Sequence, residues 1–251
     1  MDDTALAAHL ASEAGHLLRR IQRAAAPSSL GSRELKDQGD RESQAFIAQG
    51  LAEQRPDDAV LSEEAPDDRA RLGAERVWIV DPLDGTREFS EGRSDWAVHV
   101  ALWQRGALSA GAVALPGIDT VLTSEMASRS WSRPGRLRLA VSRTRMSPVV
   151  GALAAELDAE LVPMGSAGFK VAAVVRGEAD AYVHTGGQFE WDSAAPVAVA
   201  RAAGLFTSRV DGSPLTYNHE NPYLPDLLVC TPLIADELLS RLATIVKEDT
   251  P

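Results

Sequence analysis

Acidic side chains lie at the ends of several apolar segments, where they could hold a metal ion. The segment "WIVDPLDGT" places Asp81 and Asp84 three residues apart, directly after an apolar run that is typical of a strand. Glu63 ends another apolar run, and Asp192 lies at the start of a predicted helix. Carboxylate oxygens suit Mg²⁺, which keeps coordination positions for a phosphate group. Cations would neutralise these like charges, and two such ions can promote hydrolysis of a phosphate ester.

Each of these acidic residues also has a purely structural interpretation. Asp84 followed by Gly85 is a common turn, and Asp192 is an ordinary residue for a helix N-cap. Glu63 could belong to a solvated acidic loop, and Asp40 could cap the helix that we expect directly after it. Only the combination of these residues favours a metal site.

The composition of the chain limits the classes of function. The chain has 251 residues, of which 45% are hydrophobic, so it can form one large domain or two closely packed ones. The net charge of −11 excludes the broad basic surface with which proteins bind a nucleic acid polymer. An acidic protein also repels an anionic substrate, so a phosphate ligand would need a local positive centre.

The cysteine content and the apolar runs indicate a soluble cytoplasmic protein. A single cysteine, Cys230, excludes a disulfide within the chain and is interpreted as a buried apolar residue. No segment approaches the roughly 20 apolar residues of a membrane span. The first residues are acidic, whereas a signal peptide begins with basic residues.

The spacing of apolar residues predicts an alternating α/β pattern. Helices are expected at residues 3–24, 41–54, 147–157, 167–176, 192–203 and 232–247. Strands are expected at residues 77–81, 96–103, 107–115, 137–142, 179–184, 204–209 and 226–231. His99, inside the second of these strands, is interpreted as a packed or edge histidine. The polar segment 128–136 predicts a junction between an N-terminal half, 1–134, and a C-terminal half, 135–251.

The motif "WIVDPLDGT", preceded by "LSEE" and followed by "WDSAAPVAVARAAG", resembles the inositol monophosphatase superfamily of Mg²⁺-dependent, lithium-sensitive phosphatases. The resemblance extends from about Leu6 to Cys230. It implies an α/β fold, the layered αβαβα sandwich of inositol monophosphatase and fructose-1,6-bisphosphatase. It also implies that the N-terminal half carries most metal ligands and that the C-terminal half contacts the substrate.

The resemblance also implies a role for individual residues. Thr86 and Asp40 match the pair that orients and deprotonates the attacking water. The amide groups of Gly85 and Thr86 match a phosphate cradle, which a helix start also favours physically. The site would hold two Mg²⁺ ions, or three if Lys36 and Asp37 complete a third site. The implied metal ligands are Glu63, Asp81, Asp84, Asp192 and the carbonyl oxygen of Leu83.

Three segments look like one branch of the superfamily, the 3′(2′),5′-bisphosphate nucleotidases. They are "LSEE", "DPLDGTREF" and "NPYLPDLLV". This branch removes the 3′-phosphate of 3′-phosphoadenosine 5′-phosphate (PAP), and sometimes acts on its sulfated precursor, in sulfur assimilation. "AVSRTR" and "GSAGFK" resemble its substrate segments. The residues implied to face the sugar and the second phosphate are Ser142, Arg143, Ser166 and Lys170, with Asp192 as a further substrate contact.

Other interpretations stay open at this point. Arg143 could be a solvated residue at a strand end, and Lys170 a lysine on a helix surface. The chain could be a broad-specificity phosphatase for inositol 1-phosphate or fructose 1,6-bisphosphate. It could also be a non-catalytic, metal-binding regulatory protein, although every acidic residue that the family needs is present. The expected partner is a small phosphorylated nucleotide, with neither a membrane nor a nucleic acid polymer, and family analogy allows a homodimer.

Overall fold

The computed structural model describes residues 1–25, 32–132 and 135–248. Its helices are α1 (Asp3–Ala25), α2 (Ser32–Gln54), α3 (Thr86–Ser90), α4 (Pro148–Glu156), α5 (Ala167–Arg176), α6 (Glu190–Ala202) and α7 (Ala235–Glu248), with 3₁₀ turns at Arg69–Gly73, Pro116–Ile118 and Pro232–Ile234. Its strands are β1 (Ala59–Ser62), β2 (Arg76–Asp84), β3 (Ala97–Gln104), β4 (Ala107–Leu115), β5 (Thr120–Thr123), β6 (Arg138–Ser142), β7 (Glu160–Met164), β8 (Ala181–His184), β9 (Gln188–Phe189), β10 (Phe206–Ser208), β11 (Tyr223–Leu224) and β12 (Leu227–Cys230).

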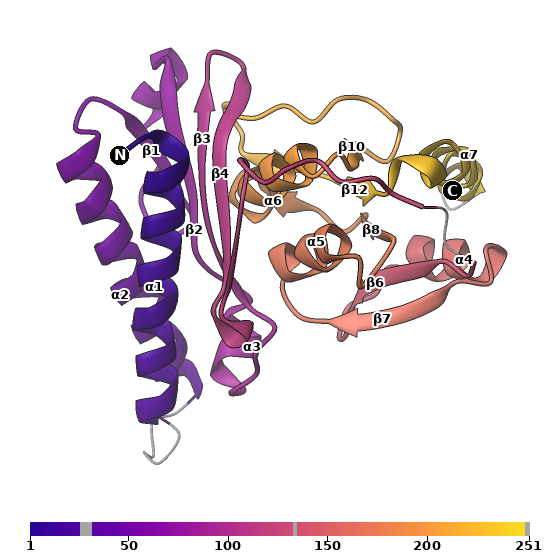
Figure 1. The fold of residues 1–251 in the computed structure, drawn as a ribbon, viewed down its shortest axis with the longest axis horizontal. Helices are drawn as coiled ribbons and strands as arrows, with labels where there is room; N and C mark the ends of the chain where they lie inside the picture. The colour runs from indigo at the N-terminus through magenta and orange to yellow at the C-terminus, as the bar shows by residue number, and fades with distance from the viewer. Residues whose placement is uncertain (26–31, 133–134, 249–251) are drawn as a thin grey trace.

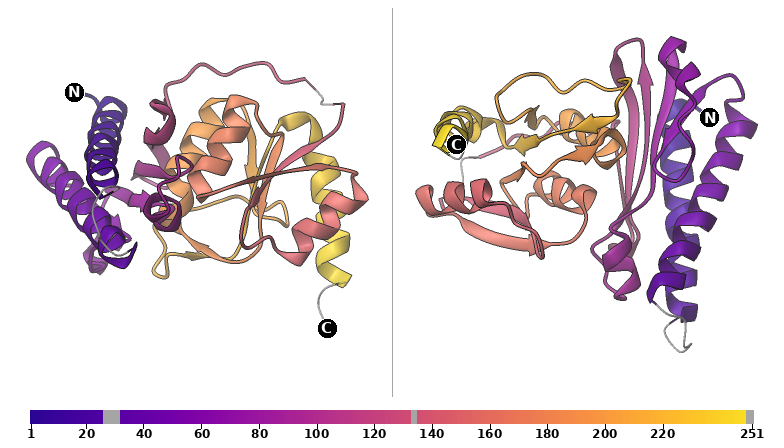
Figure 2. Two further views of the ribbon diagram at one scale, coloured as in Figure 1. Left: turned by 90° about the horizontal axis from the view of Figure 1, so that it is seen from below. Right: turned by 180° about the vertical axis from the view of Figure 1, so that it is seen from behind.

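Five layers are stacked across the molecule, as Figure 1 and the two views of Figure 2 show. Helices α1 and α2 cover the outer face of a sheet with the strand order β1-β2-β3-β4-β5. Helices α5 and α6 lie between this sheet and a second sheet, of order β10-β12-β8-β6-β7. Helices α4 and α7 cover the far face of the second sheet. The predicted αβαβα order is therefore confirmed.

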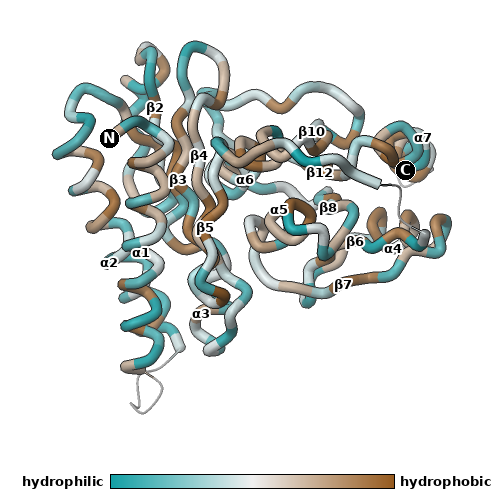
Figure 3. Tube along the Cα trace, in the orientation of Figure 1, coloured by the Kyte–Doolittle hydropathy of each residue, from teal (hydrophilic) through white to brown (hydrophobic). Residues whose placement is uncertain are grey.

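The central strands of the first sheet are apolar on both faces because helices cover both. β2 pairs in parallel with β1 and antiparallel with β3, and its residues Val77–Val80 are buried. The sequence of this segment is a continuous apolar run, without the alternation of apolar and polar residues that a half-exposed strand shows. In Figure 3 the hydrophobic colour is concentrated on the strands, while hydrophilic residues colour parts of α1 and α2. This layered burial holds the acidic end of β2 in place.

Helix α2 begins at Ser32, so the prediction of a helix over 41–54 is wrong at its start. Its buried residues recur every fourth position, as on one face of a helix. Two of them are Gly39 and Ser43, which are not large apolar residues. The spacing of apolar residues therefore did not predict the first turns of α2. Asp40 therefore lies inside the helix and cannot be its N-cap. The buried residues of α2 are Leu35, Gly39, Ser43, Ile47 and Leu51.

Other element boundaries also differ from the predictions. β2 continues to Asp84, beyond the expected end at residue 81, and α6 begins at Glu190, two residues early. A 3₁₀ turn at Pro232–Ile234 precedes α7 and replaces the expected start of that helix. The edge strands β5 and β7 were not predicted, because their residues are partly exposed and mixed in polarity.

The two predicted halves pack closely against each other. Helices α5 and α6, from the C-terminal half, share one apolar core with strands β1 to β4 of the N-terminal half. The predicted boundary between 134 and 135 touches residues 133–134, which lie outside the described residues, so the division stays a prediction. Each helix in the described ranges is too short or too polar to cross a lipid bilayer.

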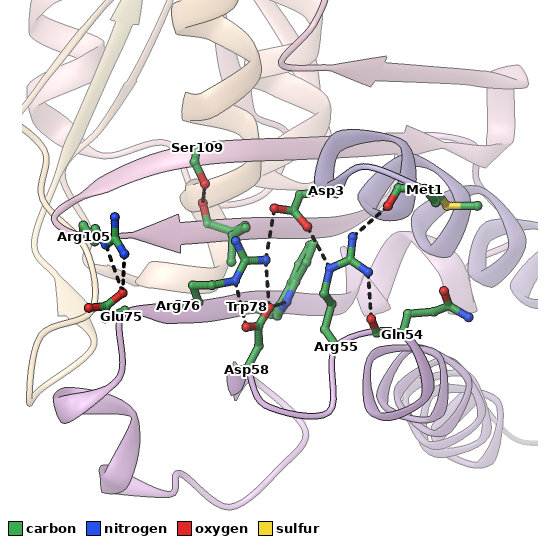
Figure 4. A network of polar contacts seen from close by, with 11 residues as sticks. Met1, Asp3, Gln54, Arg55, Asp58, Glu75, Arg76, Trp78, Arg105 and Ser109 are labelled. Atoms are coloured by element: carbon green, nitrogen blue, oxygen red, sulfur yellow. Dashed lines mark hydrogen bonds and ion pairs between the residues drawn. The ribbon is translucent and has the colours of Figure 1, made fainter.

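A network of polar contacts joins α1, the end of α2 and the start of β2 (Figure 4). The carboxylate of Asp58 accepts two hydrogen bonds from Arg76, at 2.8 and 2.9 Å, and one from the buried Trp78 indole, at 2.8 Å. Asp3 accepts from Arg55 at 2.9 Å and from Arg76 at 3.0 Å. These contacts hold the start of β2 in place, and Asp81 lies toward the other end of this strand.

We expect Asp58→Ala to lower the stability of the protein without changing turnover. The substitution leaves the buried indole N–H of Trp78 without an acceptor, which costs about 1–3 kcal/mol. A thermal melt should show a Tm about 2–10 °C lower. The matched control is Glu75→Ala, which removes a pair with Arg105 in which both side chains are 69% exposed. That control should change stability by no more than about 0.5 kcal/mol, and equal losses in both variants would contradict the role of Asp58.

Candidate metal and phosphate site

Three carboxylates converge where β2 ends and α6 begins. One oxygen each of Asp81, Asp84 and Asp192 lies within 4.8 Å of the others. In a regular strand, residues three apart point to opposite faces. The pairing with β3 slips between Asp81, opposite His99, and Asp84, opposite Ala97, so β2 carries one extra residue. This bulge re-aims the side chains and brings both acids into one cluster.

The local backbone holds each acid in this cluster. The amide of Leu83 donates to Asp81 at 3.0 Å. Asp84 accepts from the first amides of α5, those of Ala167 at 3.2 Å and Gly168 at 2.6 Å. Asp192 is the third residue of α6, not its N-cap, and accepts from the amide that precedes the helix at 2.6 Å. The cluster thus joins β2 with both central helices.

The charges of the cluster repel one another, and no cationic side chain among the described residues neutralises all of them. Burial, with repulsion from Glu63 and Asp84, raises the pKa of Asp81 well above its ordinary value. Burial and repulsion from Asp84 raise the pKa of Asp192 to about 6. Glu63 is exposed as a residue, but partial burial of its carboxyl and repulsion from Asp192 raise its pKa to about 7. Bound divalent cations would relieve this repulsion, so the residues fit Mg²⁺.

His99 is a further residue of this cluster, and sequence reasoning missed its role. It lies on β3, between β2 and β4, so the alternative of an edge histidine is wrong. Its Nε2 atom lies 3.2 Å from Asp84, and its Nδ1 atom 3.1 Å from the Trp191 carbonyl. Burial opposes ionisation of Asp84, but the neighbouring charge of His99 and the hydrogen bond from the amide of Gly168 outweigh it and lower the pKa of Asp84. His99 therefore keeps Asp84 ionised. The only signal in the sequence was a histidine inside the predicted strand 96–103.

The raised pKa values make the effect of Mg²⁺ on stability depend on pH. In the unfolded chain these carboxyls ionise near their ordinary values of 3.8 and 4.5, below the folded values of about 6 for Asp192 and about 7 for Glu63. The folded protein without metal holds more protons, so its free energy of unfolding falls as the pH rises from about 4 to about 7. Mg²⁺ takes the place of these protons. We therefore expect Mg²⁺ to raise Tm more at pH 8 than at pH 5, and equal increases would contradict the cation site.

A cavity of about 560 Å³ is lined by Asp84 and Asp192 of the cluster. Its walls also include Glu63, which follows β1, and Lys170 of α5. The backbone of Gly85 has a φ of 91°, and a side chain there would come within 2.8 Å of Ser166, so this position needs glycine. Within the described ranges, no group accepts a hydrogen bond from the amide of Gly85 or Thr86. Both residues line the cavity, so their amides are candidate donors for a phosphate cradle.

The predicted pair Asp40 and Thr86 is not joined by a hydrogen bond in the described structure. The hydroxyl of Thr86 donates to the Leu83 carbonyl at 3.3 Å. Asp40 lies on α2 next to Gly39, and Gly39 packs against the side chains of Leu83 and Phe89. Burial, with repulsion from nearby acidic groups, raises the pKa of Asp40 to about 7. The pairing of Asp40 with Thr86 stays a prediction.

Arg143 does not lie where the sequence predicted it. Its guanidinium pairs with Glu88 at 2.7 Å and with Glu91 at 2.5 Å, and Arg143 is not among the residues that line the cavity. Arg145, two residues on, does line it, and so does Arg87 at the start of α3. No described side chain pairs with either of these guanidinium groups. Arg145 therefore replaces Arg143 as the candidate receptor for a second phosphate.

The other predicted substrate residues line the cavity but also support its walls. The Ser142 hydroxyl accepts from the amide of Arg145 at 3.1 Å and so shapes the turn that carries this residue. The Ser166 hydroxyl caps α5 by accepting from Phe169 at 3.1 Å. Lys170 is buried, which excludes a lysine on the helix surface, and donates to the carbonyls of Gly165 and Ser166. Burial lowers the pKa of Lys170 to about 8.

Comparison with known proteins agrees with this geometry. The model of the inositol monophosphatase family matches residues 2–247 of the chain. A 3′-phosphoadenosine 5′-phosphate phosphatase from Mycobacterium leprae is 50% identical over 259 residues, which cover 95% of this chain and 93% of that protein. The 3′(2′),5′-bisphosphate nucleotidase CysQ of Escherichia coli K12 is 33% identical over 192 residues, 71% of this chain and 77% of that one.

A solved structure shows the same fold. CysQ from Bacteroides thetaiotaomicron, described as a bacterial member of the inositol monophosphatase family, has a TM-score of 0.80 and is 26% identical. The match covers 91% of this chain and 97% of that one. The predicted fold and the predicted resemblance are both confirmed, and the chain belongs to the inositol monophosphatase family.

Proposed function

We propose that the protein is a Mg²⁺-dependent phosphatase that removes the 3′-phosphate of PAP. The observation that carries this proposal is one cavity that is lined both by Asp84 and Asp192 of the acidic cluster and by Arg145, whose guanidinium group pairs with no described side chain. A substrate with two phosphates can engage both ends. The names of the relatives from Mycobacterium leprae and Escherichia coli, which describe PAP and bisphosphate nucleotide phosphatases, support the same substrate class.

The proposed site contains metal ligands, hydrogen-bond donors to phosphate and a proton acceptor. Glu63, Asp81, Asp84, Asp192 and the Leu83 carbonyl would hold two Mg²⁺ ions, or three with the help of Asp37. Bound Mg²⁺ would supply positive charge for the phosphoryl group and its attacking water. The free amides of Gly85 and Thr86 bind phosphoryl oxygens, where charge develops in the transition state.

The hydroxyl of Thr86 orients the attacking water in this proposal. Its hydrogen bond to the Leu83 carbonyl uses its proton and leaves its oxygen free to accept from water. As the water loses a proton, Thr86 would take it up, and its own proton would turn from the Leu83 carbonyl to Asp40. The leaving 3′-oxygen of the ribose departs from phosphorus and is protonated from solvent, so the products are inorganic phosphate and adenosine 5′-monophosphate.

Substitution of Arg145 tests the assignment of the second phosphate. Loss of a hydrogen bond to a charged group costs about 1.5–3 kcal/mol, so Arg145→Ala should lower kcat/KM for PAP by about 10- to 150-fold. Hydrolysis of adenosine 3′-monophosphate, which lacks the 5′-phosphate, should change much less. Arg143→Ala is the matched control, and any loss there should be equal for both substrates because this side chain pairs with Glu88 and Glu91. An equal effect of Arg145→Ala on both substrates would remove the basis for this assignment.

A substrate panel separates the proposal from its alternatives. Measured kcat/KM values for PAP, inositol 1-phosphate and fructose 1,6-bisphosphate should rank PAP first. A flat ranking would favour the broad-specificity phosphatase. A lack of hydrolysis of all three substrates with saturating Mg²⁺ would favour the regulatory, non-catalytic protein instead.

A further inference from the structure

Two exposed aromatic rings lie at the cavity, beside the acidic cluster. Phe189 is 42% exposed and Tyr223 is 47% exposed, and both line the cavity. They stand opposite each other on the paired strands β9 and β11. We call these two side chains the aromatic rim. Tyr182 also lines the cavity but is only 3% exposed. The aromatic rim therefore offers the cavity an exposed, flat apolar surface that no step of phosphate hydrolysis uses.

Neighbouring residues hold the aromatic rim rigidly. The ring of Phe189 stacks on Trp191, with ring centroids 4.8 Å apart and planes 11° apart. The ring of Tyr223 meets Phe189 edge-on, at 5.9 Å and 80°. Gly187 makes room for this arrangement, because a side chain there would come within 2.1 Å of the Tyr223 hydroxyl. Rings that are already held in place lose little conformational entropy when a ligand stacks on them.

The aromatic rim is directly connected to the proposed metal ligands. The amide of Phe189 donates to Asp192 at 2.6 Å. Asp84 and Asp192 line the same cavity as the aromatic rim, so the group on the ester oxygen of a phosphate at the acidic cluster shares that cavity with the two rings. In a nucleoside 3′-phosphate that group is a ribose with its base, whereas inositol phosphates and fructose phosphates carry no flat ring.

The wall beside the aromatic rim also has unused hydrogen-bonding capacity. Gln188 lines the cavity and is 7% exposed. Neither its Nε2 nor its Oε1 atom has a partner among the described residues. A buried amide without partners is unfavourable, and its adjacent donor and acceptor match those of an adenine edge. Gln188 therefore indicates a polar, base-like ligand independently of the two aromatic rings.

We propose that the aromatic rim stacks the nucleobase of the substrate and so selects nucleotides over other phosphomonoesters. This inference rests on the proposed function, because it assumes that a nucleotide occupies the cavity. Any nucleobase can stack on an aromatic side chain, whereas a ligand without a base cannot make this contact. The acidic cluster and Arg145 then recognise the two phosphates, and the aromatic rim recognises the base of the nucleoside that carries them.

Two substitutions test the aromatic rim. Phe189→Ala and Tyr223→Ala should each lower kcat/KM for PAP by about 5- to 100-fold more than kcat/KM for inositol 1-phosphate, mainly through KM. Phe189→Tyr, which keeps a ring, should restore the preference. Leu233→Ala is the matched control, because Leu233 is 53% exposed and is not among the residues lining the cavity, so it should behave as the wild type.

Binding of adenosine 5′-monophosphate gives a second readout that needs no turnover. Calorimetry in the presence of Mg²⁺ should show weaker binding by both alanine variants, while ribose 5-phosphate should bind all variants equally. If the wild type fails to hydrolyse PAP but the variants still lose affinity for the nucleotide, the proposed function fails and the aromatic rim stands. Equal losses on PAP and inositol 1-phosphate, or unchanged nucleotide binding, would overturn the aromatic rim.

Discussion

Asp84→Asn should lower kcat by roughly two or more orders of magnitude and raise the Mg²⁺ concentration needed for half-maximal activity. The substitution keeps the size of the side chain but removes one charge from a cluster whose three acids lie within 4.8 Å of one another. Asn keeps one acceptor oxygen, which can still accept from the amide of Gly168 at 2.6 Å, so only the longer contact from Ala167 at 3.2 Å is lost at the start of α5. The measurement is initial rate against Mg²⁺ concentration, and Li⁺ should inhibit the wild type, as in the family.

The control for this variant separates metal binding from folding. Loss of one charge reduces the repulsion around Asp81, so the metal-free Tm of Asp84→Asn should be no lower than that of Asp95→Asn. Asp95 is a comparably buried carboxylate that accepts from Arg93 and Gly165 and lies outside the metal cluster. Asp95→Asn should lower Tm and leave the Mg²⁺ requirement unchanged. Near-normal activity of Asp84→Asn at low Mg²⁺ would contradict the assignment of Asp84 as a metal ligand.

Asp40→Asn should lower kcat by about 10²–10⁴-fold, the usual contribution of a positioned proton acceptor. Metal affinity should change little, because Asp40 is assigned as a ligand of neither of the first two ions. Thr86→Ala should give a comparable loss, and the double variant should lose little more, because the two residues act as one unit. Rates measured for all three variants at saturating Mg²⁺ test this expectation.

The pH dependence of the rate provides the control. The ionised form of Asp40 accepts the proton, and its pKa is raised to about 7 without metal. The wild-type rate should therefore rise with pH up to about 7, and bound Mg²⁺ should move this rise to lower pH. Asp40→Asn should lose the rise. The alternative, a carboxylate of α2 with only a structural role, predicts a lower Tm with wild-type turnover and the same pH profile, and that result would end our assignment.

The sequence by itself determined the elements whose buried residues are apolar and evenly spaced. Helix α1 and strands β3 and β4 occur within one or two residues of their predicted bounds, because each buries a continuous apolar face. The sequence also determined the acidic motif and the family. Residues 32–40 of α2 were missed because Gly39 and Ser43 occupy buried positions, where close packing against Leu83 and Phe89 matters more than hydrophobicity.

Only the tertiary structure decided how the site is assembled. The bulge that turns Asp81 and Asp84 toward one point depends on the register of β2 against β3, which local sequence does not encode. The local sequence does not distinguish Arg143 from Arg145. Glu88 and Glu91, more than 50 residues away along the chain, pair with Arg143, whereas no described side chain pairs with the guanidinium group of Arg145. His99 reaches Asp84 through the same strand pairing. These features are long-range contacts, and their energies depend on which elements meet after folding.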